Sequence, residues 1–269
     1  MTTLKIALAG LGAIGSAVAR KLQDGALPGM ELVAVAARDP AKARATLNAM
    51  SSRVPVMALG ELAGVADIVV ECAPAALLSD IAAPVLRAGK KLVVLSVGAL
   101  LTRMELIDLA QRHGGQIIVP TGALLGLDAV AAAAEGTIHS VQMTTRKPIE
   151  GLLGAPYLVE NKIDIEHLKE PLRVFSGSAR EAAKGFPANL NVAVALSLAG
   201  IGPDRTRLEI WADPTVTRNT HRIVVDSDAA RLDMTIENIP SENPRTGRIT
   251  ALSVIAALRK LNAPLRVGT

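Results

Sequence analysis

The sequence predicts an α/β fold with two domains, a doubly wound parallel sheet followed by an α+β domain with a mixed sheet. Three observations support this prediction. Residues 4–9 form an apolar run that ends in a glycine-rich turn. Apolar runs and helical patterns then alternate as far as Pro120. Beyond Pro120 several extended runs follow with helices between them, which is typical of a mixed or antiparallel sheet.

The first domain is predicted from five short apolar runs and the helical patterns between them. The strands are expected at 4–9, 31–37, 67–72, 91–95 and 116–119. The helices are expected near 14–24, 40–49, 76–88 and 102–112. Runs as apolar as ADIVVECA and KKLVVLSV suit strands of a sheet that is covered on both faces.

The first strand leads into the glycine-rich turn Gly10-Leu11-Gly12-Ala13-Ile14-Gly15, which opens a helix. Gly10 permits the tight turn, Gly12 lets a pyrophosphate approach the backbone, and Gly15 lets the helix pack close to the strand. The helix N-terminus then faces the phosphates. This pattern predicts a Rossmann-type dinucleotide-binding domain over residues 1–121. Its predicted cofactor-binding residues include Gly10, Gly12, Ala13, Ile14 and Gly15; the alternative is a tight turn without a ligand.

The end of the second strand bears on the choice of cofactor. An NAD-specific site usually has Asp or Glu there to bind the ribose hydroxyls. This chain has Ala36-Ala37-Arg38-Asp39, and Arg38 could receive a 2′-phosphate. Asp39 could instead cap the helix that Pro40 opens. We therefore expect NAD or NADP as cofactor, with Arg38 in its site, and the sequence does not decide which of the two is preferred.

The second domain is predicted over residues 122–244 as an α+β substrate and catalytic domain. An alanine-rich helix lies in GALLGLDAVAAAAEG, and helical patterns over 178–200 are broken at Gly185-Phe186-Pro187. Strands are expected at 137–146, 206–212, 221–227 and 230–239, with a hairpin turn at 226–228. Residues 245–269 hold a C-terminal helix, which we expect to dock on the first domain.

Composition excludes several classes of partner. Lys and Arg number 29 against 25 Asp and Glu, and they are scattered rather than clustered, so we expect no nucleic-acid partner. Charged residues interrupt every long apolar run, and the N-terminal run is interpreted as a strand rather than a signal peptide. We therefore expect a cytoplasmic protein without a membrane partner. We also expect no metal site, because no His/Cys cluster has ligand spacing. Cys72, the only cysteine, is expected to be a small buried hydrophobe.

Four segments resemble the L-aspartate dehydrogenase family. They are GLGAIG near the start, GALLGLDA at 122–129, AAKGFPANLNVAVALSLAGIGPDRT at 182–206, and ADPTVTRNTHRI at 212–223. The resemblance runs through nearly the whole chain. It implies a homodimer with a small-molecule substrate, and a reversible, NAD(P)-dependent oxidation of L-aspartate to iminoaspartate. That product hydrolyses to oxaloacetate and ammonia or feeds pyridine-nucleotide biosynthesis.

The resemblance also implies roles for three residues. His221, in TRNTHRI, corresponds to the active-site residue of the family. Ala123 and Asn189 correspond to residues that contact the cofactor, although Asn189 could also cap the following helix. One departure is Leu125, where the family pattern has a small residue, often glycine. This departure concerns the shape of the loop rather than the assignment.

A histidine suits the implied chemistry, because the amine must lose a proton and water must then attack the imine. A side chain that titrates near neutrality can serve both steps. His221 lies between a polar loop and an apolar strand, where a catalytic group can be exposed on a rigid element. The other three histidines are expected to be surface or structural residues. Candidates for binding the substrate carboxylates, among which the sequence does not choose, are Arg146, Lys147, Lys162, Arg218 and Arg222.

Two other functions compete with this interpretation. An imine reductase of the dihydrodipicolinate reductase type shares the two-domain plan, but paired histidines followed by lysine are expected there, and this chain has no His-His pair. A non-catalytic protein that senses the redox state of NAD(P) would bind the cofactor without transferring hydride.

Overall fold

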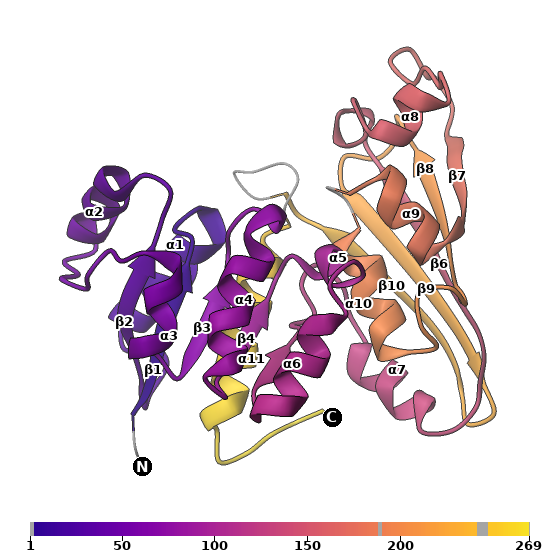
Figure 1. Cartoon of the computed structure of the whole chain (residues 1–269). Helices are drawn as coiled ribbons and strands as arrows, with labels where there is room; N and C mark the ends of the chain where they lie inside the picture. Colours follow the sequence, from indigo (N-terminus) through magenta and orange to yellow (C-terminus); the bar gives the residue numbers. More distant parts are fainter. Residues whose placement is uncertain (1–2, 188–189, 241–246, 269) are drawn as a thin grey trace. The chain divides into compact units, whose positions relative to one another are not determined.

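The computed structural model describes residues 3–187, 190–240 and 247–268. These residues fall into two compact units (Figure 1). The first unit lies within residues 1–122 and 251–266, and the second within 123–250 and 267–269. Among the described residues, no helix combines the length and apolarity that crossing a membrane requires.

The first unit is built on a sheet of five parallel strands in the order β2-β1-β3-β4-β5. The strands are β1 (Leu4–Ala9), β2 (Met30–Ala36), β3 (Ile68–Glu71), β4 (Lys91–Val94) and β5 (Gln116–Ile118). The helices are α1 (Ala13–Gln23), α2 (Pro40–Ala49), α3 (Leu62–Val65), α4 (Leu78–Arg87), α5 (Val97–Leu100), α6 (Glu105–His113) and α11 (Ile249–Asn262). Short 3-10 turns precede α3 and α4, at Leu59–Glu61 and Ala75–Leu77. The predicted doubly wound sheet is confirmed.

The strand order creates a switch point between β1 and β3. The chain adds β2 on one side of β1 and then returns to place β3 on the other side. In open parallel sheets, ligands bind beyond the carboxyl ends of the strands at such a point. Ile6, Ala7, Leu8 and Ala9 are all fully buried in β1, and successive residues of a strand point to opposite faces, so both faces of the sheet are covered.

The C-terminal helix contributes to the core of the first unit. Val254, Ile255 and Leu258 of α11 are buried in the same apolar cluster as Ile6 of β1 and Val18 of α1. This cluster is aliphatic throughout, as the scarcity of aromatic residues requires.

The second unit contains a mixed sheet in the order β10-β9-β6-β8-β7. Its strands are β6 (Ile138–Lys147), β7 (Leu172–Ser178), β8 (Thr206–Ala212), β9 (Asn219–Ser227) and β10 (Arg231–Asn238). Only β6 and β8 pair in parallel among these strands, and the other pairs are antiparallel. The helices are α7 (Leu127–Ala134), α8 (Pro156–Glu160), α9 (Ala179–Gly185) and α10 (Asn191–Ala199), with a 3-10 turn at Ile149–Gly151.

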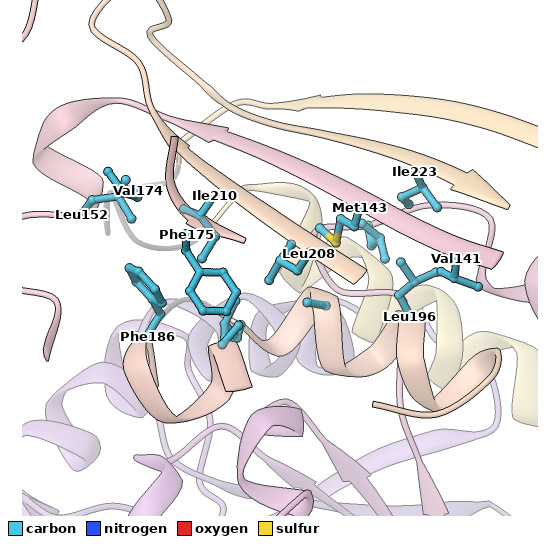
Figure 2. Close-up of a cluster of buried hydrophobic side chains, with 14 of the residues drawn as sticks. Val141, Met143, Leu152, Val174, Phe175, Phe186, Leu196, Leu208, Ile210 and Ile223 are labelled. Atoms are coloured by element: carbon cyan, nitrogen blue, oxygen red, sulfur yellow. The ribbon is translucent and has the colours of Figure 1, made fainter. Parts of the chain in front are cut away.

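Figure 2 shows the core between this sheet and its helices. Inward-facing residues of β6, β8 and β9 meet Leu196 of α10 and Phe186, which follows α9. The rings of Tyr157, Phe175 and Phe186 pack against one another with centroids 5.3 to 5.7 Å apart. Three of the four aromatic residues of the chain thus lie in one cluster, which packs α8 and α9 against β7.

Two elements of this unit were not predicted. The short helix α8 and most of the strand β7 lie between the strand expected to end at residue 146 and the helical patterns expected from residue 178, a stretch for which no element was predicted. The alternation of LRVFSGS is interrupted by a shift in register between Arg173 and Phe175, which removes the usual signal of a strand. The predicted hairpin is confirmed, since Ser227 N–H donates to the Ala230 carbonyl between β9 and β10.

Candidate active site

The glycine-rich turn joins β1 to α1, and its own packing requires two of its three glycines. Gly10 has φ of +113°, and a Cβ there would lie 2.5 Å from the carbonyl oxygen of Cys72. A Cβ on Gly15 would collide with the carbonyl oxygen of Gly10. The fold itself therefore explains glycine at these two positions.

Gly12 is different, because the fold does not require a glycine there. Its φ of −75° is open to any residue, and a Cβ would meet no described atom within 4 Å. Gly12 is the N-cap of α1, an 11-residue helix without acidic residues in its first turn. Ala13 and Ile14 begin that helix, so their N–H groups have no partner within it. Open space over a helix N-terminus fits a pyrophosphate, and the residues present therefore suit a dinucleotide.

The carboxyl end of β2 carries Arg38 on the surface. The neighbouring Asp39 caps α2, since its Oδ1 accepts from the N–H of Lys42 at 3.0 Å. The predicted capping role of Asp39 is thus confirmed. Because the Asp39 carboxylate caps α2, it is not the group expected to bind the ribose hydroxyls. Arg38 is the exposed cation at this end of β2.

A buried carboxylate that sequence reasoning missed organises the same edge of the sheet. Glu71, the last residue of β3, is fully buried and accepts hydrogen bonds from the N–H groups of Ala73, Leu95 and Ser96 and from the Ser96 hydroxyl, at 2.8 to 3.1 Å. Burial raises the pKa of Glu71, and the hydrogen bonds offset part of that rise. Glu71 thereby fixes the loops that follow β3 and β4. The adjacent Cys72 packs partly buried against the core, and burial raises the pKa of its thiol.

In the second unit, the inner face of the sheet changes from apolar to polar along two neighbouring strands. On β6 the inward positions run from Val141 and Met143 to Thr145 and Lys147, all of them buried. On β9 they run from Val225 and Ile223 to His221 and Asn219. Thr145 pairs directly with His221 across the two strands. We call Thr145, Lys147, Asn219 and His221 the polar row.

His221 lies at the centre of the polar row and is only 3% exposed. Its Nδ1 lies 3.0 Å from the Thr145 hydroxyl oxygen. Burial and the positive charge of Lys147 lower the pKa of His221 to about 3. The expectation that His221 is exposed was wrong. β9 begins at Asn219, two residues before the predicted start, and places His221 inside the sheet.

Lys147 is the buried cation of the polar row. Its side chain is almost fully enclosed, and burial lowers the pKa of the ammonium group to about 8. Three of the other four candidate cations are engaged with carboxylates of this chain. Arg146 donates to Asp213 at 3.0 Å, and the Arg222–Asp233 and Arg218–Glu237 pairs are 2.6 and 3.8 Å apart. Lys162 is exposed in the turn after α8.

The loop that holds Ala123 is fastened to the end of β10. Asn238 is buried, and its Nδ2 donates to the Ala123 carbonyl at 3.0 Å. Asn238 pairs in register with Asn219, so Ala123 is held in line with the polar row. Leu125 packs partly buried against the core of the second unit, which explains how this loop accommodates a residue larger than expected. Asn189 lies outside the described residues.

The other three histidines do not lie in a buried polar environment like that of His221. His113, His139 and His167 are all exposed, as expected for surface residues. Within the described residues no three or more His, Cys, Asp or Glu side chains are grouped so that they could hold a metal ion.

Comparison with known proteins first gives the class. The family model "Homoserine dehydrogenase, NAD binding domain" matches residues 10–120, which places the first unit among the NAD-binding domains of dehydrogenases. The model "Aspartate dehydrogenase, C-terminal" matches residues 128–261, which include the polar row.

Similarity to individual proteins is more specific. The chain is 63% identical to L-aspartate dehydrogenase of Bradyrhizobium diazoefficiens, covering 99% of this chain and 94% of that protein. It is 64% identical to L-aspartate dehydrogenase 3 of Bordetella bronchiseptica, covering 99% and 98%. The crystal structure of aspartate dehydrogenase from Thermotoga maritima superposes with a TM-score of 0.73 at 25% identity, covering 98% and 99%. The chain belongs to the L-aspartate dehydrogenase family.

Proposed function

We propose that the chain oxidises L-aspartate to iminoaspartate with NAD+ or NADP+, and catalyses the reverse reductive amination. The observation that carries this proposal is the polar row, a buried histidine and a buried lysine in a family whose named members act on aspartate. Iminoaspartate then reacts with water to give oxaloacetate and ammonia.

In this proposal one unit binds the cofactor and the other binds the substrate. The first unit is the cofactor domain, in which Gly10 and Gly15 shape the turn, Gly12 leaves room for the pyrophosphate, and the N–H groups of Ala13 and Ile14 bind it. A nicotinamide held there would supply the hydride acceptor for the substrate Cα. The second unit is the substrate domain.

Three further residues complete the proposed cofactor site. Arg38 receives the 2′-phosphate of NADP, since it is the exposed cation at the end of β2. Ala123 and Asn189 contact the cofactor, a role that rests on the family resemblance. The Asn238 hydrogen bond supports Ala123 by fixing its carbonyl group.

His221 is proposed as the catalytic residue. Because Nδ1 faces the Thr145 hydroxyl, Nε2 is the atom available to the substrate. The neutral imidazole accepts a proton from the substrate amine and later assists the attack of water on the imine. The low pKa of His221 belongs to the protein without substrate. A dicarboxylate brings negative charge to the polar row, which raises the pKa of His221 and makes it a better base.

We also propose that the chain is a cytoplasmic protein without a membrane partner and, from the family resemblance, that it is a homodimer. Light scattering on the purified protein tests the dimer, and a mass of one chain would contradict it.

A substrate panel tests the proposed activity. Oxidation of NADH or NADPH is followed by absorbance with oxaloacetate plus ammonium, and reduction of NAD+ or NADP+ is followed with L-aspartate, D-aspartate and L-alanine. We expect turnover with oxaloacetate plus ammonium and with L-aspartate only. Activity on dihydrodipicolinate instead would favour an imine reductase, and cofactor binding without any turnover would favour a redox sensor.

A further inference from the structure

Lys147 occupies an unusual position for a lysine. It is the last residue of β6 and continues the inward-facing series of that strand, so its side chain points to the buried face. Lysine is seldom enclosed in this way, because removing an ammonium group from water is unfavourable. The cost is visible as the lowered pKa of Lys147, whose cause is burial. The sheet therefore places a positive charge on its inner face, at the end where β6 finishes.

The surroundings of Lys147 link it to His221. Thr145, two residues earlier on the same face, is paired across the strands with His221. Lys147 is close enough that its charge lowers the pKa of that histidine. A Cβ added to Gly151 would lie 3.9 Å from Lys147 Cβ and 3.8 Å from Asn219 Oδ1, so these two side chains border the same small residue. The cation, the amide and the imidazole therefore share one end of the sheet.

We propose that Lys147 binds a carboxylate of the dicarboxylate substrate, beside the histidine that acts on its amine. This proposal rests on the proposed function and adds the residue that recognises the acid. Of the five candidate cations, Arg146, Arg218 and Arg222 form ion pairs with carboxylates of this chain, and Lys162 is exposed. Lys147 is the member of this set that lies in the polar row.

The spacing agrees with a small substrate. One two-residue repeat of a strand, about 6.6 Å, separates the position of Lys147 from the position paired with His221. In the proposed complex a four-carbon amino acid lies with its amine toward the imidazole and a carboxylate toward the ammonium. The bound carboxylate also offsets the charge that Lys147 exerts on His221, so binding the acid prepares the histidine to accept a proton.

The test replaces Lys147 with methionine, which is similar in length and uncharged. Calorimetry measures the binding of succinate, a dicarboxylate without an amine, to the protein saturated with NADPH. Steady-state kinetics measure KM and kcat for L-aspartate. We expect the succinate Kd and the aspartate KM to rise about 10- to 150-fold, the loss of one charge-assisted hydrogen bond, with an unchanged Kd for NADPH. Lys147→Arg, which keeps the charge, is expected to retain part of the succinate affinity.

Arg222→Met is the matched control. It also removes a cation next to His221 in the sequence, but Arg222 is exposed and paired with Asp233, so we expect unchanged succinate binding. Wild-type succinate affinity in folded Lys147→Met would overturn the proposal. Should that variant not fold, Lys147→Gln is measured in the same way with the same criterion. A wild-type protein that binds succinate but does not oxidise aspartate would contradict the proposed function. The succinate affinities of the variants would still decide whether Lys147 binds a carboxylate.

Discussion

The substitution Gly12→Val distinguishes an effect on folding stability from an effect on cofactor binding. A side chain at Gly12 enters open space in the protein alone, since no described atom lies within 4 Å of the added Cβ. The expected loss of stability is about 1 kcal/mol, from a poorer N-cap on α1, which lowers the Tm by about 2–4 °C. In the complex the same space is expected to hold the pyrophosphate.

The effect on binding should be much larger than the effect on folding. Displacing the pyrophosphate loses at least one charge-assisted hydrogen bond to the N-terminus of α1, about 1.5–3 kcal/mol, or about 10- to 150-fold in Kd for NADPH. Fluorescence titration measures that Kd, and thermal unfolding on the same preparation measures the Tm. Gly60→Val is the matched control, because its Cβ also meets no described atom within 4 Å but lies in a 3-10 turn remote in sequence from the glycine-rich turn.

Two outcomes bear on this reasoning. Wild-type affinity in Gly12→Val would show that the open space is not where the pyrophosphate lies. Gly10→Ala provides the contrast, since its Cβ meets the Cys72 carbonyl at a φ that disfavours alanine, and it should lose stability and binding together.

Three further predictions concern the cofactor, the chemistry and pH. Arg38→Ala should weaken NADPH binding by about 10- to 150-fold and NADH binding little; equal changes in the two dissociation constants, measured by titration, would remove Arg38 from the 2′-phosphate site. His221→Ala should lower kcat by about 10²- to 10⁴-fold with unchanged NADPH affinity; near-normal kcat in the folded variant would assign the chemistry elsewhere. Because burial lowers the pKa of His221 to about 3, the unfolded chain binds a proton that the folded chain excludes as pH falls below the ordinary histidine value. The free energy of unfolding, measured with urea, should therefore decrease from pH 7 to pH 4 more in the wild type than in His221→Asn, and equal decreases would contradict the buried neutral histidine.

Local patterns in the sequence were sufficient to predict the parallel sheet. Most residues in each strand of the first unit are apolar, and the turn after β1 combines three glycines at a spacing that only a few structures require. β7 lacked such a signal, because its register shift at Arg173–Phe175 breaks the alternation of its side chains.

The environment of the polar row depends on pairings between strands distant in sequence. TTRK and NTHR look like exposed polar stretches, although the alternation from Val141 and Met143 could have indicated that Thr145 and Lys147 face inward. No local pattern shows that Thr145 lies opposite His221, 76 residues away, or that Glu71 accepts hydrogen bonds from a loop 24 and 25 residues further along. The sequence therefore identified His221 mainly through the family resemblance, and its burial could be seen only in the fold.

The central claim is that hydride passes from Cα of L-aspartate to the nicotinamide. L-[2-²H]aspartate and NAD+ or NADP+ are incubated with the purified protein, and the reduced cofactor and keto acid are analysed by mass spectrometry. We predict one deuterium in each reduced nicotinamide, with oxaloacetate and ammonia formed in equal amounts. Reduced cofactor without deuterium, or no reduction by aspartate with either cofactor, would contradict the account.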